Sequence, residues 1–241
     1  MYDIISERID LVKKEKVTAI ILAAGQGKRM NADMNKQYLL LAGYPMLYYT
    51  IKAFENSNVD EIILVVGKDE IEYCKENIVE QYNFKKVHHI VVGGKERYHS
   101  VYQGLQAVRV ADYVMIHDGA RPFVTIDIME RTLEAAKKYG ACVAGVPSKD
   151  TVKTADKLGF VKDTLERSAV WNIQTPQTFL YEKIYQAYQI LFQKGELQEI
   201  TDDAMIWEKV FKSKIKIVQG SYENIKITTP SDLKWGELFC K

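Results

Sequence analysis

A run of small residues followed by two cations is the stretch of this chain best suited to chemistry. The small residues are Ala23, Ala24, Gly25 and Gly27, and the cations are Lys28 and Arg29. Because small residues leave the backbone bare, a ligand can lie against it and accept hydrogen bonds from its amides. The cations add positive charge where those amides already favour an anion. The stretch therefore predicts a phosphate-binding loop; the alternative is a glycine turn with solvated cations.

Two better-known phosphate loops do not fit this stretch. The dinucleotide fingerprint has a third glycine three residues after the second, where this chain has Met30. The Walker pattern has four residues between its glycines and then Lys-Ser or Lys-Thr, and neither feature is present here. A nucleotide would have to be bound by a loop of another pattern.

Two further loops combine glycine with charge. Residues 93–100 read Gly-Gly-Lys-Glu-Arg-Tyr-His-Ser, and residues 117–122 read His-Asp-Gly-Ala-Arg-Pro. An apolar run that is typical of a buried strand precedes each of these loops, at residues 87–92 and at residues 113–116. Residues 17–22 form such a run before the first loop. In an open parallel sheet, ligands bind beyond the carboxyl ends of the strands. We therefore expect all three loops to meet at one edge of a sheet and to form one site.

Apolar runs alternate with stretches of helical periodicity up to residue 146. This order predicts a single α/β domain with a Rossmann-like, mostly parallel sheet and helices on both of its faces. Thr125 and Gly140 fit the cap and the stop of one helix, and Pro45 fits the first turn of another. The remaining strands are expected at residues 61–66 and 142–146, and the helices from residue 45 and at residues 69–81, 101–108 and 125–139.

Residues 148–174 break this alternation. Residues 152–154 and 160–162 are expected to pair as a hairpin across a turn at residues 156–159. The hairpin is mostly polar, so little apolar surface holds it on the sheet, and we expect a protruding β-arm. A second copy of the chain is the expected support, which predicts a homodimer through the arm. The alternative is an unsupported surface hairpin.

The C-terminal part returns to regular elements. Alternation along the last expected strand places Asn224 and Lys226 on one side, and we expect that side to face the cleft. Thr201 fits the cap of the helix that follows it. Helices are expected at residues 181–193, at residues 202–211 and from Pro230, and short strands at residues 214–218 and 224–228.

Composition limits the class of protein. The chain has 241 residues, of which 47% are hydrophobic and 27% charged, which fits one large α/β domain. A formal net charge of +1 offers no general attraction to nucleic acid or to a membrane. No apolar run reaches membrane-spanning length, and residues 1–16 mix charged with apolar residues, unlike a signal peptide. The three cysteines are dispersed and odd in number. We therefore expect a cytoplasmic protein with residues 1–16 as an N-terminal extension.

Eight motifs resemble, in the same order, those of the 2-C-methyl-D-erythritol 4-phosphate cytidylyltransferases of the non-mevalonate isoprenoid pathway. The resemblance runs from about residue 17 to the C-terminus. It departs at Leu22, where the family often has proline, and at Gly119, where alanine is frequent, and neither departure removes a charged group. The motifs span residues 22–30, 36–38, 93–97, 117–122, 150–153, 166–171, 174–177 and 224–230.

The resemblance implies a cytidylyltransferase domain over residues 17–241, with residues 148–174 as the β-arm of a homodimer. It implies transfer of CMP from CTP to 2-C-methyl-D-erythritol 4-phosphate, with release of pyrophosphate. Mg²⁺ is the implied cofactor, bound mainly through the phosphates of CTP, with Asp118 as a protein ligand. A phosphate monoester has a second pKa of about 6, so this nucleophile needs no general base. The reaction needs cations that position and neutralise phosphates.

The resemblance also assigns individual residues. The first two loops would hold the cytosine and ribose, and Arg29 and Lys36 the triphosphate. On the arm, Thr151 and Arg167 would reach the substrate of the neighbouring subunit; for Arg167 the alternative is an ion pair with Glu166 or Asp163. The four histidines show no triad or metal spacing and are interpreted as strand or loop residues. The implied catalytic residues are Arg29, Lys36, Arg167 and Lys226. The implied substrate-binding residues are Ala23, Ala24, Gly25, Gly27, Gly94, Ser100, Asp118, Gly119, Arg121, Thr151 and Thr175.

Two other functions stay open at this point. A cytidylyltransferase for another polyol phosphate, such as ribitol 5-phosphate, shares the first loop and the Lys226 motif, whereas residues 167–171 favour the methylerythritol substrate. A regulatory subunit that binds nucleotide without turnover would be expected to lack one or more cations of the cleft, and all of them are present in this sequence.

Overall fold

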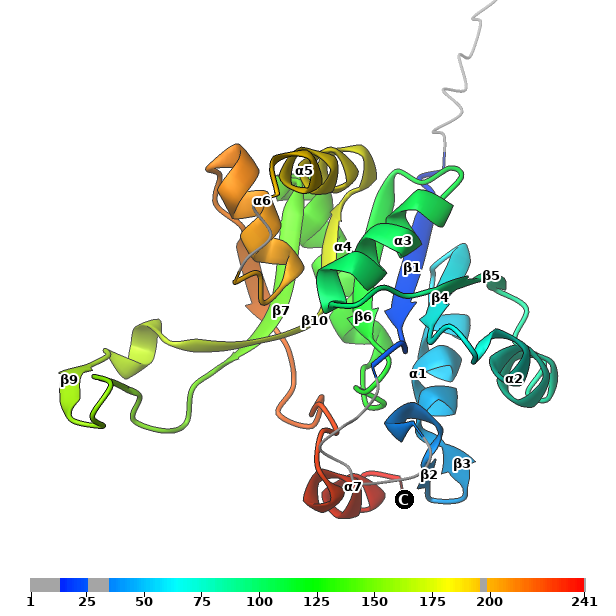
Figure 1. Ribbon diagram of the computed structural model, residues 1–241, viewed down its shortest axis with the longest axis horizontal. Helices are drawn as coiled ribbons and strands as arrows, with labels where there is room; N and C mark the ends of the chain where they lie inside the picture. The colour runs from blue at the N-terminus through cyan, green and yellow to red at the C-terminus, as the bar shows by residue number, and fades with distance from the viewer. Residues whose placement is uncertain (1–13, 26–34, 196–198, 241) are drawn as a thin grey trace, which may run out of the picture.

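Seven strands form one sheet through the centre of the molecule (Figure 1). The computed structural model describes residues 14–25, 35–195 and 199–240. The strands are β1 Val17–Leu22, β4 Glu61–Val66, β5 Val87–Val92, β6 Tyr113–Asp118, β7 Ala141–Pro147, β10 Trp171–Leu180 and β11 Lys216–Gln219. Their spatial order is β11-β7-β10-β6-β1-β4-β5.

The sheet is mostly parallel, as the sequence predicts. Strands β5, β4, β1 and β6 are parallel neighbours, and β11 is parallel to β7. Strand β10 runs antiparallel between β6 and β7. Sequence patterns did not predict β10, because its buried stretch includes the polar side chains of Gln174, Gln177 and Thr178, which do not mark a buried strand.

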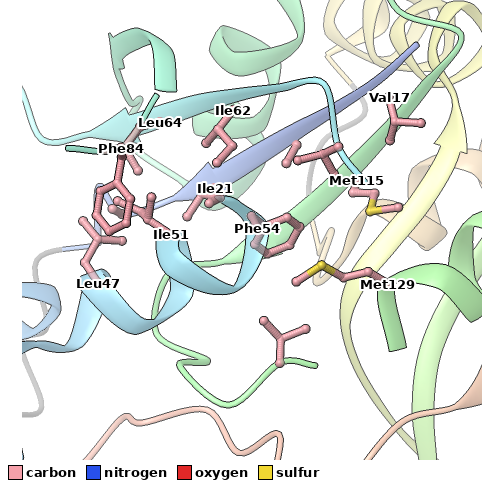
Figure 2. Close-up of a cluster of buried hydrophobic side chains, with 14 of the residues drawn as sticks. Val17, Ile21, Leu47, Ile51, Phe54, Ile62, Leu64, Phe84, Met115 and Met129 are labelled. Atoms are coloured by element: carbon pink, nitrogen blue, oxygen red, sulfur yellow. The ribbon is translucent and has the colours of Figure 1, made fainter. Parts of the chain in front are cut away.

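Helices cover both faces of the sheet. Alternation along β1 points Ile21 toward a core shared with α1, α2 and α4, and Ile20 toward a core shared with α3, α5 and α6. Figure 2 shows the first core, where Phe54 of α1 lies near Ile21 and Met115. The helices are α1 Met46–Glu55, α2 Ile71–Cys74, α3 Arg97–Ala107, α4 Ile126–Tyr139, α5 Tyr181–Lys194, α6 Asp203–Phe211 and α7 Pro230–Glu237, and α2 continues as a π-helix over Lys75–Glu80.

The helix ends follow the sequence signals with two differences. As expected, the Thr125 side chain accepts a hydrogen bond from the backbone of Ile128 at the start of α4, and Gly140 ends that helix at φ 84°. Helix α6, however, is capped by Asp202, whose carboxylate accepts from the Met205 amide at 3.0 Å, and not by Thr201. Helix α3 begins earlier than expected, so the charged residues of the second loop lie at its first turn.

A small subdomain lies below the carboxyl ends of the strands, built from α7 and the ribbon of β2 (Leu40–Leu41) and β3 (Tyr44–Pro45) (Figure 1). The expected strand at residues 224–228 is wrong: this segment is an extended loop. Its Ile227 amide donates to the Ala120 carbonyl at 2.9 Å, and the Ile227 side chain packs with Leu41. The alternating isoleucines are therefore buried by the subdomain and not by strand pairing.

The expected β-arm protrudes from the domain (Figure 1). It is a hairpin of β8 (Lys153–Ala155) and β9 (Val161–Thr164), whose residues are exposed on both faces. The expected N-terminal extension, residues 1–16, lies mostly outside the described residues. Across the described part of the chain, no helix is both long and apolar enough to cross a membrane.

Candidate active site

A cavity of about 620 Å³ opens at the carboxyl ends of β1 and β6. All three loops singled out in the sequence contribute to its wall, so their expected convergence is confirmed. Eight of the predicted site residues line it: Ala23, Ala24, Gly25, Lys36, Gly94, Ser100, Asp118 and Lys226. A smaller cavity of about 360 Å³, at the amino ends of β1 and β6, is lined by none of the predicted residues.

The first two loops bring bare backbone to the cavity. A Cβ atom added to Gly93 would lie 2.4 Å from the Cβ of Ala24, and one added to Gly94 would lie 2.3 Å from the Cβ of His99. Only glycine allows this close approach. The Gly94 amide donates to the hydroxyl of Ser100 at 3.1 Å. Ser100 therefore holds the second loop in place, in addition to its predicted role in binding the substrate.

Asp118, at the end of β6, is a buried carboxylate with three cations around it. Its Oδ1 accepts from the Nε of Arg97 at 3.2 Å, and its Oδ2 lies 2.8 Å from the Nζ of Lys226 and 3.8 Å from the Nε of Arg121. Burial alone would raise the pKa of this carboxyl, but Arg97, Lys226 and Arg121 together hold the pKa well below its usual range. Asp118 is therefore an anion at any physiological pH, and it organises the cations at the cavity.

Arg97 is fixed by a second carboxylate. Its two terminal nitrogens each donate to Asp203 at 2.8 Å, and Asp203 is fully buried at the start of α6. Asp203 also accepts from the hydroxyl of Tyr188 at 2.6 Å. This planar pair ties α3 to α6 and aims the remaining Nε of Arg97 at Asp118. Neither Arg97 nor Asp203 was among the predicted site residues.

Lys36 reaches the cavity from a single helical turn, Lys36–Tyr38. Its Nζ donates to the carbonyl of Ile227 at 3.2 Å, which places it next to the segment that carries Lys226. The neighbouring Gln37 donates from its side chain to the carbonyl of Ala23. Two of the predicted catalytic lysines therefore line one cavity, and the turn that carries Lys36 is joined directly to the first loop.

Glu70 holds this turn from behind. Its carboxylate accepts from the hydroxyl of Tyr38 at 2.9 Å, from the side chain of Gln37 at 3.2 Å and from the Gly67 amide at 3.1 Å. Sequence patterns did not single out Glu70, because an acidic residue just before a helix has many ordinary roles. Its contact with the turn is visible only in three dimensions.

Arg121 and Asn224 lie behind Asp118. Arg121 donates from a terminal nitrogen to the Asn224 carbonyl at 2.7 Å, and the Asn224 side chain donates to the Thr175 carbonyl at 2.9 Å. Of the two residues expected to face the cleft, Lys226 lines the cavity, whereas Asn224 is fully buried behind Asp118 and does not line it, so the expected orientation is wrong for Asn224. Within the described residues, Arg121 Nε and Asn224 Oδ1 are the buried side-chain atoms without a hydrogen-bond partner.

His117 and Thr175 lie behind the cavity wall, next to Asp118. His117 is fully buried in β6, and burial lowers its pKa to about 4, so the imidazole is neutral. Its Nδ1 lies 3.0 Å from the hydroxyl of Thr175, which also accepts from the Asp118 amide at 3.1 Å. Thr175 is therefore brought to Asp118 but does not line the cavity.

The remaining predicted residues are placed elsewhere. Thr151 and Arg167 are exposed on the arm and do not line the cavity of their own chain. No described residue forms an ion pair with Arg167, so the alternative of an ion pair with Glu166 or Asp163 is not supported. Gly119 is buried against β1, where its amide donates to the Leu22 carbonyl at 2.8 Å. The predicted Gly27 and Arg29 lie outside the described residues.

A mostly parallel sheet, bare loops at its carboxyl edge and a cluster of cations around one cavity define the chain as a nucleotidyltransferase of the α/β class. A family model described as IspD, 2-C-methyl-D-erythritol 4-phosphate cytidylyltransferase, matches residues 17–241. The chain belongs to this family and is a transferase enzyme.

Relatives and solved structures agree with this assignment. The chain is 51% identical over 224 residues to the 2-C-methyl-D-erythritol 4-phosphate cytidylyltransferase of Lachnoclostridium phytofermentans, covering 92% of this chain and 95% of that protein. It is 48% identical over 223 residues to the same-named protein of Clostridium novyi, with 92% and 95% covered. The crystal structure of 4-diphosphocytidyl-2C-methyl-D-erythritol synthase from Anaerococcus prevotii matches with a TM-score of 0.81 and 35% identity, covering 94% and 96%. Neither alternative function is favoured.

Proposed function

We propose that the chain transfers CMP from CTP to 2-C-methyl-D-erythritol 4-phosphate in the cavity at the carboxyl ends of β1 and β6. The products are 4-diphosphocytidyl-2-C-methyl-D-erythritol, an isoprenoid precursor, and pyrophosphate. Family membership supports the activity. The observation that carries the placement is that Lys36 and Lys226, from distant parts of the sequence, line one cavity to which the first two loops contribute small residues with bare backbone.

In the proposed reaction, a phosphate oxygen of the methylerythritol substrate attacks the α-phosphorus of CTP. A new P–O bond forms, the bond from the α-phosphorus to the bridging oxygen breaks, and pyrophosphate leaves with the electron pair. The attacking phosphate is largely deprotonated at neutral pH because its second pKa is about 6. The enzyme therefore has to align two phosphates and offset their repulsion, and cations fixed in place before the reaction do this at little cost of reorganisation.

The residue roles follow from position. Lys36 and Lys226 contact the phosphates, and Arg29 is assigned to the triphosphate on its motif alone. Ala23, Ala24, Gly25, Gly94 and Ser100 hold the cytosine and ribose against the bare backbone. Asp118 lies at the cavity, next to the transferred group, and Gly119, Arg121 and Thr175 are assigned to hold it in place from behind. Arg121 Nε is a buried donor without a hydrogen-bond partner among the described residues and lies 3.8 Å from Oδ2 of Asp118, so Arg121 is assigned to the site through the charge of that carboxylate.

The described residues do not offer a ready-made magnesium site. They contain no group of three or more His, Cys, Asp or Glu side chains that would hold a metal ion. Both oxygens of Asp118, the predicted metal ligand, already contact cations of the protein. We therefore propose that Mg²⁺ would be held mainly by the phosphates of CTP and would supply neutralisation of charge on the leaving pyrophosphate, and that Asp118 acts first as the partner of the protein's own cations.

Removal of divalent metal is expected to abolish turnover and leave the fold intact, because residues 14–25, 35–195 and 199–240 contain no cage of protein ligands for an ion. Pyrophosphate release and the thermal midpoint, both measured with and without EDTA, check this, and added Mg²⁺ should restore activity. A large drop in the thermal midpoint on metal removal would instead indicate a structural metal site.

The arm supports a homodimer. The hairpin exposes apolar side chains at its tip, with Leu158 82% and Phe160 70% exposed, and an isolated two-stranded hairpin is marginally stable in water. Arg167 and Thr151 belong to predicted substrate motifs yet lie away from the cavity of their own chain. We propose that each arm packs on a second copy and brings these two residues to the partner's cavity.

Mixed dimers test this arrangement. Lys226→Ala disables the cavity, whereas Arg167→Ala disables only the arm, so a dimer with one of each has one site with both changes and one site with neither. Co-expression of the two inactive variants is expected to restore about a quarter of wild-type activity, because half of the dimers are mixed and half of their sites are intact.

The matched control pairs Lys226→Ala with Lys36→Ala. Both changes affect the cavity of their own subunit, so no site in the mixed dimer is intact and activity should stay absent. Equal recovery in the two mixtures, or no recovery in the first, would contradict a shared site.

We also infer a cytoplasmic location. The cysteines Cys74, Cys142 and Cys240 are free thiols, and Cys74 and Cys142 are buried. Unpaired thiols are typical of proteins in a reducing compartment.

Turnover of CTP with defined polyol phosphates, followed as pyrophosphate release, tests the proposed function. We expect a kcat/KM for 2-C-methyl-D-erythritol 4-phosphate far above that for ribitol 5-phosphate, and little turnover when ATP replaces CTP. A preference for ribitol 5-phosphate would contradict the assigned substrate. Binding of CTP without release of pyrophosphate in any mixture would identify a regulatory subunit.

A further inference from the structure

We propose that His117 is a positioning residue of the transfer reaction, which fixes the backbone of Asp118 through the hydroxyl of Thr175. His117 does not line the cavity and was interpreted from the sequence as an ordinary strand or loop residue. The role assigned here is indirect, and it rests on the proposed function because it acts through Asp118.

For the neutral ring, the hydrogen bonds around His117 have only one consistent direction. Its Nε2 lies 3.2 Å from the Arg121 carbonyl, and a carbonyl only accepts, so Nε2 carries the proton. The Asp118 amide donates to the Thr175 hydroxyl oxygen at 3.1 Å. The hydroxyl proton is then free to donate to Nδ1 of His117 at 3.0 Å. The neutral ring therefore has its proton on Nε2 and accepts at Nδ1.

This line of hydrogen bonds fixes the turn that carries the site. The imidazole bridges from β6 to the carbonyl of Arg121, so it spans the turn that holds both Asp118 and Arg121. Through Thr175 the imidazole also joins this turn to β10. The side chain of Asn224 donates to the Thr175 carbonyl at 2.9 Å, which connects β10 to the segment that carries Lys226. A shift of Thr175 would therefore alter how Asp118 meets Lys226, 2.8 Å away.

If His117 had only a structural role, its replacement would lower stability without a specific effect on kcat. The ring also packs against Phe54, with ring centroids 5.1 Å apart, so its loss would reduce stability even if the hydrogen bonds were unimportant. His117→Leu keeps an apolar group of similar size but removes both ring nitrogens. His117→Asn keeps an acceptor near the position of Nδ1. Thr175→Val removes the hydroxyl with almost no change in shape, and Thr175→Ser keeps it.

Kinetics of these variants with CTP and 2-C-methyl-D-erythritol 4-phosphate test the proposal. We expect His117→Leu and Thr175→Val each to lower kcat about tenfold, with a smaller change in KM for CTP, and the double variant to be no slower than the slower single variant, because both break the same line. His117→Asn and Thr175→Ser should recover part of the lost kcat. Effects on kcat that multiply in the double variant, or a loss confined to the thermal midpoint, would overturn the proposal.

A spectroscopic readout remains if a variant does not fold. Ring ¹⁵N chemical shifts of His117 in the wild-type protein are expected to show the neutral tautomer with the proton on Nε2, and Thr175→Val should shift the Nδ1 signal. A proton on Nδ1 would overturn the assigned direction even in an active enzyme. Absence of CTP turnover together with the expected tautomer would contradict the proposed function and not this hydrogen-bond pattern.

Discussion

Replacement of Lys36 by alanine is expected to lower kcat about a thousandfold, the effect typical of removing a fixed charge that stabilises a transition state. Lys36 lies at the cavity wall on a turn that Gln37 and Tyr38 hold in place by their own hydrogen bonds. The fold should therefore survive the loss of its side chain. Steady-state pyrophosphate release, with the thermal midpoint as a check on folding, measures the effect.

Lys68→Ala is the matched control for this change. Lys68 comes shortly after β4, is exposed and does not line the cavity, so its loss removes the same charge without affecting the cavity. Lys36→Arg should retain more activity than Lys36→Ala because it keeps the charge. Unimpaired turnover in Lys36→Ala would refute the role assigned to this lysine.

Replacement of Asp118 by alanine is expected to damage both stability and activity. Without this carboxylate, Arg97, Lys226 and Arg121 are left as neighbouring buried or half-buried cations. Removal of one partner from a buried ion pair typically costs about 3–5 kcal/mol. Urea denaturation at pH 7 measures the change in the free energy of unfolding, and pyrophosphate release measures the loss of turnover. An alanine variant as stable as the wild type would contradict the part assigned to Asp118 in holding the three cations.

The contribution of Asp118 to the free energy of unfolding is expected to decrease in acid. The folded-state pKa of Asp118 lies below the ordinary value of 3.8, so its charged form stabilises the fold at any pH above that ordinary value. The difference in unfolding free energy between the wild type and Asp118→Asn should be constant from pH 8 to pH 5 and decrease only in stronger acid. A difference that already declines between pH 7 and pH 6 would contradict a lowered pKa.

The parallel half of the fold was predictable because β1, β4 and β6 are largely apolar runs buried on both faces, and β5 at the edge keeps four apolar residues of six. Strand β10 was not, because its polar residues are buried by contacts from distant segments: Gln177, for example, binds the amides of Asp203 and Ala204. The extended loop at residues 224–228 has the alternation of a strand, yet its isoleucines pack on a subdomain that local patterns do not reveal. In both cases tertiary contacts outweigh the local signal.

The site divides in the same way. Lys36, Lys226 and the bare loops have recognisable motifs, and the shared parallel direction of β1, β5 and β6 brings the loops to one edge. The pairing of Arg97 with Asp203 has no local signal, because the two residues are more than a hundred positions apart and each looks like an ordinary helix residue. The roles of Arg29 and Gly27 stay predictions from the motif.

The arm leaves the sheet at the end of β7 and returns at the start of β10, where Pro147 and Trp171 are paired neighbours. Its two ends are thus held side by side by the domain itself, and its own sequence does not have to close the gap. If the arms pair two copies as proposed, we expect an arm grafted from a relative with different tip residues to change which chains pair, while the cavity at the carboxyl ends of β1 and β6 stays as it is.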